Sequence, residues 1–407
     1  MIETIILDGD LHSALAATRS LGKRGLKVAV GSDVLPSLAS RSRYCAEAFQ
    51  YPSPSLEPQK FLAALREYAE RHRGCVLLPM RDITLEEVLR NAEAFRGMVK
   101  VPFAEHAIYS AASDKAYVLR LAKKLGVPAP ATLFPADFSG TEELIREASK
   151  LGYPLVIKPC RSRFRAGGIW HSTHVRYASG EIELREILNE SAFGASSFVL
   201  QERIEGEGTG IFLLMNGGQV LGRFAHRRIR EKPPSGGVSV LCESIGMPDR
   251  AFGHAAELLR ALDWSGVAMV EFKMDKRDNL AKLMEINARF WGSLELAISA
   301  GVDFPFLLYR LAVEGKADPP PDYRIGIKSR WELGDLDHLL IRMKKKNNEL
   351  FLPAGAPTKF GVVKDFVLDY FRPSIRNEVL RLDDPGPFLF ELGQYIKELF
   401  RKLYSGK

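Results

Sequence analysis

The sequence lacks several features that would assign it to a special class of protein. Its four cysteines, Cys45, Cys75, Cys160 and Cys242, are far apart and form no C-x-x-C pair. This spacing predicts free buried thiols rather than a disulfide framework. No segment approaches the ~18 unbroken apolar residues of a membrane-spanning helix, and no basic stretch precedes the first apolar run as it does in a signal peptide. We therefore expect a cytoplasmic protein with no transmembrane segment.

Other absences argue against particular functions. The net charge of +7 is modest for 407 residues, and aromatic side chains are not interleaved with the basic ones, so we expect no nucleic-acid partner. There is no G-x-G-x-x-G, and the carboxylates of Asp8 and Asp10 would repel a pyrophosphate, which disfavours NAD binding. No Ser-His-Asp or Cys-His arrangement is apparent. The length allows two or three domains, each with its own core.

The first part of the chain alternates apolar strands with amphipathic helices. Strands are predicted at 5–9, 27–32 and 75–79, with helices at 12–23 and 61–72 between them. This alternation predicts a parallel α/β sheet of the Rossmann-like kind, which would contribute one wall of a cleft.

The stretch 267–287 contains two β-rich runs around a polar turn, which predicts a hairpin. Side chains alternate faces along a strand, so Glu285 and Asn287 share one face, and pairing symmetric about Arg277 places Glu271 on the same face. Two carboxylates and an amide oxygen suit Mg²⁺ held beside a phosphate. The alternative is a solvated hairpin face on which the acids lie by chance.

Basic residues elsewhere predict contacts to a phosphate. Arg289 follows the acids, and a guanidinium there suits a phosphate or carboxylate that passes through a charged transition state. Lys115 is predicted in the first turn of a helix capped by Ser113, where a cation opposes the helix dipole unless an anion lies nearby. Lys158 ends a strongly apolar strand. For Lys115 the simpler alternative is a solvated side chain, whereas a lysine that leaves a buried run, as Lys158 does, is expected to have a function.

Three further segments predict loops or hinges. Three arginines at 161–165 precede Gly167 and Gly168, a basic loop whose glycines would let backbone amides approach phosphate oxygens. The run 201–208 reads as a strand, a polar hinge and a second strand, which is where an adenine and ribose could bind. Residues 226–239 predict a mobile basic loop. The alternative for the first segment is a surface hairpin loop with scattered charge, and the alternative for the third is a disordered surface loop.

Taken together, Lys115, Lys158, Gln201-Glu202-x-Ile204, Glu271 and Glu285-x-Asn287-x-Arg289 resemble the ATP-grasp superfamily in their order and spacing. The run EINARFWGS is similar to a bacterial branch related to the carbamoyl phosphate synthetase large subunit. The resemblance covers about residues 1–315. It implies a mixed α/β and α+β fold with a Rossmann-like domain at 1–110 and an ATP-grasp domain at 111–316, whose two subdomains, about 128–203 and 204–316, grip the nucleotide. A helical extension at 317–407 follows the proline-rich segment.

The resemblance also implies roles for individual residues. Lys115 and Lys158 would contact the nucleotide phosphates, with Gly167 and Gly168 in the phosphate loop, although that loop carries arginines where many relatives have glycine and serine. The other implied roles are an adenine hinge at Gln201, Glu202 and Ile204, a ribose contact at Glu207, Mg²⁺ or Mn²⁺ ligands at Glu271, Glu285 and Asn287, and catalytic roles for Arg289 and Lys158.

The activity implied is an ATP-dependent ligase that activates a carboxylate as an acyl phosphate and couples it to an amine or thiol. The alternatives are a small-molecule kinase and a catalytically silent ATP-binding regulatory or scaffold protein. The expected partners are small molecules and, from symmetry, a second copy in a homodimer. The amphipathic C-terminal helix is expected to dock on the protein's own core rather than on a membrane.

Overall fold

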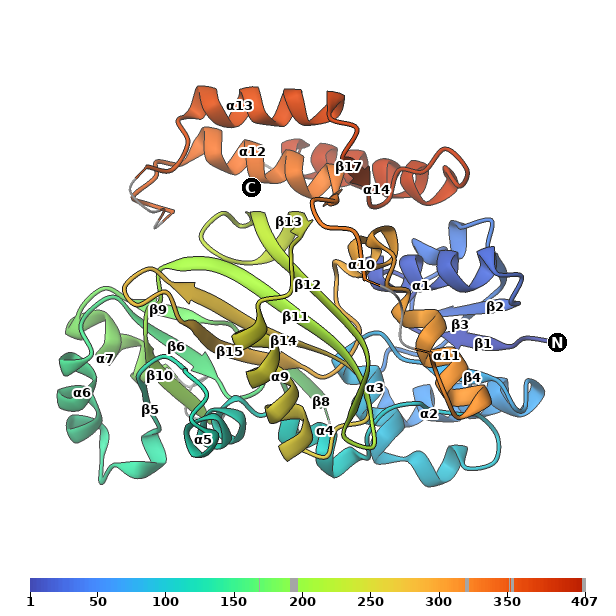
Figure 1. Ribbon diagram of the computed structural model, residues 1–407, viewed down its shortest axis with the longest axis horizontal. Helices are drawn as coiled ribbons and strands as arrows, with labels where there is room; N and C mark the ends of the chain where they lie inside the picture. The colour runs from blue at the N-terminus through green and yellow to red at the C-terminus, as the bar shows by residue number, and fades with distance from the viewer. Residues whose placement is uncertain (168, 191–196, 319–321, 351, 353–354, 405–407) are drawn as a thin grey trace.

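The computed structural model describes residues 1–167, 169–190, 197–318, 322–350, 352 and 355–404. The N-terminal region lies at one side of the molecule, the central sheets occupy the middle, and helices of the C-terminal segment lie across the top of the view (Figure 1). The domain boundaries proposed from the sequence stay predictions.

The N-terminal region contains the predicted parallel sheet, with the strand order β3-β2-β1-β4. Strands β1, β2 and β4 are fully buried, as expected for a parallel sheet covered on both faces. Strand β3 was not predicted because its side chains are mostly exposed and carry no apolar run. The elements are β1 (Thr4–Ile6), α1 (His12–Lys23), β2 (Val28–Ser32), η1 (Ala39–Arg41), β3 (Cys45–Gln50), α2 (Pro58–Arg71), β4 (Val76–Leu78), α3 (Asp82–Arg90) and η2 (Ala92–Phe95).

A second, antiparallel sheet follows, with the order β5-β10-β6-β9. Apolar side chains of α6 and α7 pack against its central strands in one core. A separate two-stranded hairpin, β7-β8, extends from this region. The elements are α4 (His106–Ala112), α5 (Lys115–Leu125), β5 (Thr132–Leu133), η3 (Pro135–Asp137), α6 (Thr141–Lys150), β6 (Leu155–Pro159), β7 (Arg163–Ala166), β8 (Ile169–Ser172), β9 (Arg176–Ala178), α7 (Glu181–Asn189) and β10 (Phe198–Glu202).

The third sheet is the centre of the molecule and has the order β15-β14-β11-β12-β13-β16-β17. Strand β11 shows how it is buried on both faces. Ile211 and Leu213 belong to the core that includes α9, whereas Phe212 and Leu214 belong to the core that includes α10 and α11. The elements are β11 (Gly206–Asn216), β12 (Gln219–Lys232), β13 (Val238–Ser244), α9 (Asp249–Ala261), β14 (Gly266–Asp275), β15 (Ala281–Asn287), α10 (Leu294–Ala300) and α11 (Phe304–Glu314).

The C-terminal segment is not purely helical. Strand β16 pairs with β13 and then with β17, so this segment completes the edge of the third sheet. In α14, Phe388 and Phe390 pack on the core as predicted, but residues 396–402 are exposed. The elements are β16 (Lys328–Arg330), α12 (Glu332–Lys344), α13 (Lys359–Leu368), η4 (Asp369–Phe371), β17 (Ile375–Asn377) and α14 (Gly386–Tyr404).

Two local predictions were wrong. Residues 226–232 are not a loop but the end of strand β12, because arginines along this stretch pair with carboxylates of neighbouring elements. The N-cap of α5 is Asp114 rather than Ser113, since the Asp114 carboxylate accepts a hydrogen bond of 3.0 Å from the Tyr117 amide. Gly126 ends this helix with φ +70°, as its position predicted.

Within the described residues, a single helix with the length and apolarity for a bilayer crossing was not found. The bent pair of α10 and α11, whose axes differ by 86°, reaches that length and composition only when the two helices are taken together.

Candidate functional site

The hairpin β14-β15 places Glu271 directly opposite Glu285. Near the turn, Phe272 faces Leu283, a register one residue away from the predicted symmetric one. Continued without interruption, that register would set Glu271 opposite Met284 and Glu285 on the other face. A β-bulge between Glu271 and Phe272 takes up the extra residue and brings the two carboxylates together. The predicted common face is therefore present, but the bulge creates it.

Both carboxylates line a cavity of about 710 Å³ between the second and third sheets. Most residues proposed from the sequence line the same cavity: Lys115, Lys158, Glu202, Ile204, Glu271, Glu285, Asn287 and Arg289. Gln201, Gly167 and Glu207 do not line it, and Gly168 lies outside the described residues. These eight residues come from five segments of the chain.

Lys115 neutralises Glu285. The backbone amide of Lys115 donates a hydrogen bond of 2.9 Å to the Cys160 carbonyl, which ties the start of α5 to the end of β6. From there the Lys115 Nζ reaches to 3.0 Å from Glu285 Oε2. Burial opposes the ammonium charge, but Glu285 raises the pKa of Lys115 above its usual value. In return Lys115 lowers the pKa of Glu285 to about 2, so Glu285 is ionised.

Glu271 has a different partner, Arg228 of β12. The Arg228 guanidinium bonds both Glu271 and Glu231. Burial raises the pKa of Glu271; Arg228 opposes this shift and the charge of Glu285 adds to it. Arg228 was singled out in the sequence only as part of a basic loop. Its pairing with Glu271 depends on strand order, because β11 separates β12 from β14 in the sheet.

Lys158 has no carboxylate partner among the described residues. Its nearest polar contact is the Met284 sulfur at 3.8 Å. Burial lowers the pKa of Lys158 to about 8, Lys115 acts in the same direction, and Glu285 opposes both. A buried ammonium with an uncompensated charge is suited to an anionic ligand.

Asn287, the last residue of β15, and Arg289, two residues after it, extend the site. The Asn287 amide donates to Glu285 Oε1 at 3.2 Å, and an Arg289 Nη2 lies 3.5 Å from Asn287 Oδ1. The Arg289 Nε donates to Asp82 Oδ1 at 2.8 Å, and its Nη1 donates to the Phe290 carbonyl. Asp82 starts α3 of the N-terminal sheet region. The sequence around Asp82 gave no sign of this contact, since 207 positions separate the two residues.

The described residues hold no cluster of three or more His, Cys, Asp or Glu side chains suited to a metal ion. The candidate metal ligands are the carboxylates of Glu271 and Glu285 and the side-chain oxygen of Asn287. All are oxygen donors of the kind Mg²⁺ prefers. In this structure Lys115 and Arg228 supply the positive charge that the two acids require. The residues present fit a divalent cation placed next to a phosphate.

The predicted hinge is divided between two environments. Glu202 accepts from the Ala131 amide at 2.9 Å and from Arg277 at 2.7 Å, at the edge of the cavity. Gln201 is buried on the other face of β10, where it donates to Thr132. Glu207 lies on a neighbouring cavity and pairs with Arg227 at 3.5 Å.

Part of the predicted phosphate loop is strand β7 of the β7-β8 hairpin, and Gly167, which follows this strand, has φ +58°. This hairpin docks on the N-terminal region. Arg165 lies 3.2 Å from Glu87, and the Trp170 indole donates to the same Glu87 oxygen at 2.9 Å. The arginine-rich segment therefore contacts α3 instead of lining the cavity.

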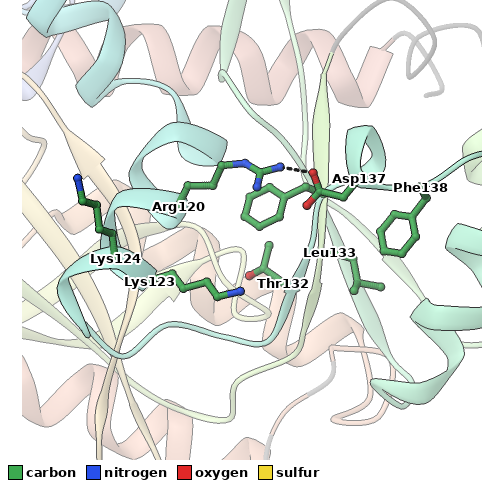
Figure 2. Close-up of a pocket in the computed structure, with 8 residues that line it drawn as sticks. Arg120, Lys123, Lys124, Thr132, Leu133, Asp137 and Phe138 are labelled. Carbon is green, nitrogen blue, oxygen red and sulfur yellow. Dashed lines mark hydrogen bonds and ion pairs between the residues drawn. The ribbon is translucent and has the colours of Figure 1, made fainter.

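A further cavity of about 490 Å³ lies outside this site. Figure 2 shows Arg120, Lys123 and Lys124 of α5 on one side of it, with Arg120 directed at Asp137. None of the residues proposed from the sequence lines this cavity. We therefore place the candidate nucleotide site in the cavity that contains Glu271 and Glu285.

The low pKa of Lys158 predicts a stability effect. Below about pH 8 the folded protein keeps a desolvated charge that the unfolded chain solvates freely, so the Lys158→Met variant should have a higher free energy of unfolding by about 1 to 3 kcal/mol at pH 7. The gain should fade between pH 8 and the ordinary lysine pKa near 10.5. Denaturant unfolding across this pH range measures it, with the exposed Lys124→Met as control; a gain independent of pH would contradict the assignment.

Residues 195–332 match the family described as ATP-grasp in the biosynthetic pathway with Ter operon. D-alanine–D-alanine ligases of Thermoanaerobacter sp. (strain X514) and Thermoanaerobacter pseudethanolicus are 23% identical over 205 residues, which is 47% of this chain and 55% of each relative. The chain thus spans about half the length of the curated relatives it matches.

Several solved structures are similar over most of the chain. The biotin carboxylase domain of the Hydrogenobacter thermophilus 2-oxoglutarate carboxylase, in complex with Mg-ADP, ADP and bicarbonate, has a TM-score of 0.62 at 16% identity and covers 81% of this chain and 73% of that one. The N5-carboxyaminoimidazole synthetase of Staphylococcus aureus has a TM-score of 0.60 at 17% identity, covering 80% of both chains. The L-amino acid ligase of Bacillus licheniformis has a TM-score of 0.57 at 17% identity, covering 79% and 75%. The chain therefore has the ATP-grasp fold, as its sheets and its paired acidic hairpin indicate.

Proposed function

We propose that the protein is an ATP- and Mg²⁺-dependent ligase that activates a carboxylate as an acyl phosphate and joins it to an amine. The observation that carries this proposal is the pairing of Glu271 with Glu285 in one cavity with two lysines and an arginine. The relatives named as ligases support the same chemistry. A cytoplasmic location and a homodimer stay predictions.

The reaction has two transfers, and atoms balance in each. A carboxylate oxygen of the substrate attacks the γ-phosphorus of ATP, the bond to the β-phosphate oxygen breaks, and ADP leaves. The amine nitrogen then attacks the carbonyl carbon of the acyl phosphate, inorganic phosphate leaves, and the nitrogen loses a proton. Such chemistry requires mainly positioning and charge neutralisation from the protein.

The side chains of the cavity suit these two requirements. Lys115 and Lys158 approach the acidic pair from α5 and β6 and would neutralise phosphate oxygens. A triphosphate beside Lys158 would raise the pKa of this lysine back toward its ordinary value, so nucleotide binding would take up protons near pH 8. Glu202 and Ile204, at the other end, border the space for the adenine.

The metal would be held by Glu271, Glu285 and the Asn287 oxygen, with Mn²⁺ as an alternative ion. A bound divalent cation would supply positive charge to the transferring phosphate. Hydrogen bonds to Asp82 and to the Phe290 carbonyl hold the Arg289 guanidinium, which would stabilise negative charge on the phosphate or on the acyl group. The ribose contact of Glu207 stays a prediction, since Glu207 lines the neighbouring cavity and not this one.

The first experiment identifies the reaction class. The protein with ATP and Mg²⁺ is screened against pairs of carboxylic acids and amines, including amino acids, and products are analysed by mass spectrometry and phosphate release. A ligase gives an amide and free phosphate. A phosphorylated substrate without amide would identify a kinase, and binding of ATP without any turnover would identify a silent nucleotide-binding protein.

The Glu285→Gln variant tests the metal assignment. It keeps the shape of the side chain but removes the charge that the cation and Lys115 require, so Mg²⁺-dependent ADP formation should fall by about 100-fold or more. The exposed Glu257→Gln on α9 is the matched control and should keep wild-type turnover. Wild-type ADP formation by Glu285→Gln would remove the metal site from the proposal.

Asp82 is a positioning residue for Arg289. In the Asp82→Asn variant the arginine loses its charged partner, so kcat should fall about tenfold while KM for ATP changes little. In an Arg289→Lys background the same substitution should add almost nothing, because the two residues act through one contact. Equal and additive losses in both backgrounds would show that Asp82 acts independently of Arg289.

A further inference from the structure

Another cavity, of about 460 Å³, lies between the third sheet and the C-terminal helices α12 and α13. It is called the second cavity below, and the candidate nucleotide site is the first. These two helices lie above the sheet in Figure 1, with α13 outermost. The cavity adjoins the candidate nucleotide site, since Arg203, Ile204, Arg228, Glu231, Ser235 and Lys273 line both. Asn287 and Arg289, at the proposed reaction centre, do not line it.

Several charges in this cavity are already neutralised. Arg228 bonds Glu231 at 2.9 Å, and Arg230 forms a bidentate contact with Asp335. Glu207 pairs with Arg227. These pairs account for part of the lining and leave no strong preference for a ligand of either sign.

The remaining charges are mainly positive. Lys273 and Lys276 of β14 and the following turn have no ion pair with the described residues, and neither has Arg342 of α12. Among the carboxylates that line the cavity, Asp365 of α13 alone also has no ion pair with the described residues. None of the residues outside the described ranges has a carboxylate side chain, so the sequence offers these three cations no further acidic partner there.

The environment of Arg342 is the strongest evidence that this cavity binds an anion. Only 4% of this residue is exposed, yet its guanidinium donates to neutral groups alone: the Asn347 side-chain oxygen at 2.9 Å and the Pro357 carbonyl at 2.6 Å. Burial lowers the pKa of Arg342 below its ordinary value. Arginine side chains nevertheless stay protonated in proteins, so the guanidinium carries its charge. A buried guanidinium without a counter-charge is costly unless an anion binds beside it.

We propose that this cavity binds a small anion with a phosphate or carboxylate group, held by Arg342, Lys273 and Lys276. The site is separate from the proposed reaction centre and does not depend on ligase activity. Its ligand would lie next to the hinge residues 203–208 and next to Arg228, which holds Glu271. A ligand bound in this cavity would thus affect the nucleotide site.

The test is equilibrium dialysis of the full chain with radiolabelled phosphate at constant ionic strength, with and without saturating Mg-ADP. Phosphate bound in the presence of Mg-ADP lies either in the second cavity or at the γ-phosphate position that ADP leaves empty, and the cavity variants distinguish these two sites. Succinate as competitor distinguishes the two ligand chemistries: displacement shows that a carboxylate suffices, and its absence shows a requirement for phosphate.

Arg342→Gln and Lys276→Gln should each weaken the phosphate binding that persists with Mg-ADP by about tenfold. The exposed Lys344→Gln and Lys345→Gln, at the end of the same helix, should change it less than twofold. If Arg342→Gln fails to fold, the exposed Lys276→Gln carries the test. Phosphate displaced completely by Mg-ADP, or equal binding by wild type and both cavity variants, would overturn the proposal.

The design separates this inference from the proposed ligase function. If Mg-ADP does not bind, the nucleotide assignment fails, and the phosphate titration of the unliganded chain with the same variants still decides the second site. If Mg-ADP binds but the variants have no effect on phosphate, the anion site fails alone.

Discussion

The site depends on the charge balance of two glutamates placed opposite each other on neighbouring strands. Two carboxylates on directly paired residues repel each other, and without compensating positive charge one of them would take up a proton. Lys115, at the start of a helix, supplies positive charge to Glu285, and Arg228, on another strand of the sheet, supplies it to Glu271. The acidic pair therefore exists as part of a four-residue network, and a divalent cation would enter a site whose negative charge is already organised.

The cavity also depends on contacts between regions that are distant in the chain. Asp82 holds Arg289 in place from the N-terminal region, and Arg161 donates to the Ser110 carbonyl and hydroxyl from the loop after β6. Glu87, which is fully buried, holds the β7-β8 hairpin through Arg165 and Trp170. The N-terminal parallel sheet thus acts less as a ligand site of its own than as a frame for the side chains of the central cavity.

Buried ion pairs attach the C-terminal segment. Asp335 accepts from both Arg230 and Arg330, and Arg19 of α1 bonds Asp384 at 2.8 Å. Replacing such pairs with apolar residues would often cost nothing in stability, so their better-supported role is to fix where the segment docks. This docking completes the third sheet with β16 and β17 and covers the second cavity. The segment is therefore built into the fold around the nucleotide site.

The sequence by itself determined the features that depend on local pattern. Alternation of strands and helices predicted the parallel sheet, and the two β-rich runs around the turn at 275–279 predicted the acidic hairpin. Lys115 and Lys158 were placed correctly at a helix start and near a strand end, because apolar periodicity is a property of neighbouring residues. The resemblance carried by Glu285-x-Asn287-x-Arg289 indicated the ATP-grasp fold.

Only the tertiary structure decided which side chains meet. A bulge in the pairing of β14 with β15 brings Glu285 opposite Glu271, and a one-residue slip of register would have separated the acids. The pairing of Arg228 with Glu271 and the tie from Asp82 to Arg289 join positions 43 and 207 residues apart. Local sequence carries no record of such contacts, because their energy comes from long-range burial and charge. The same limitation left strand β3, the docked phosphate hairpin and the uncompensated Arg342 to be revealed by the fold.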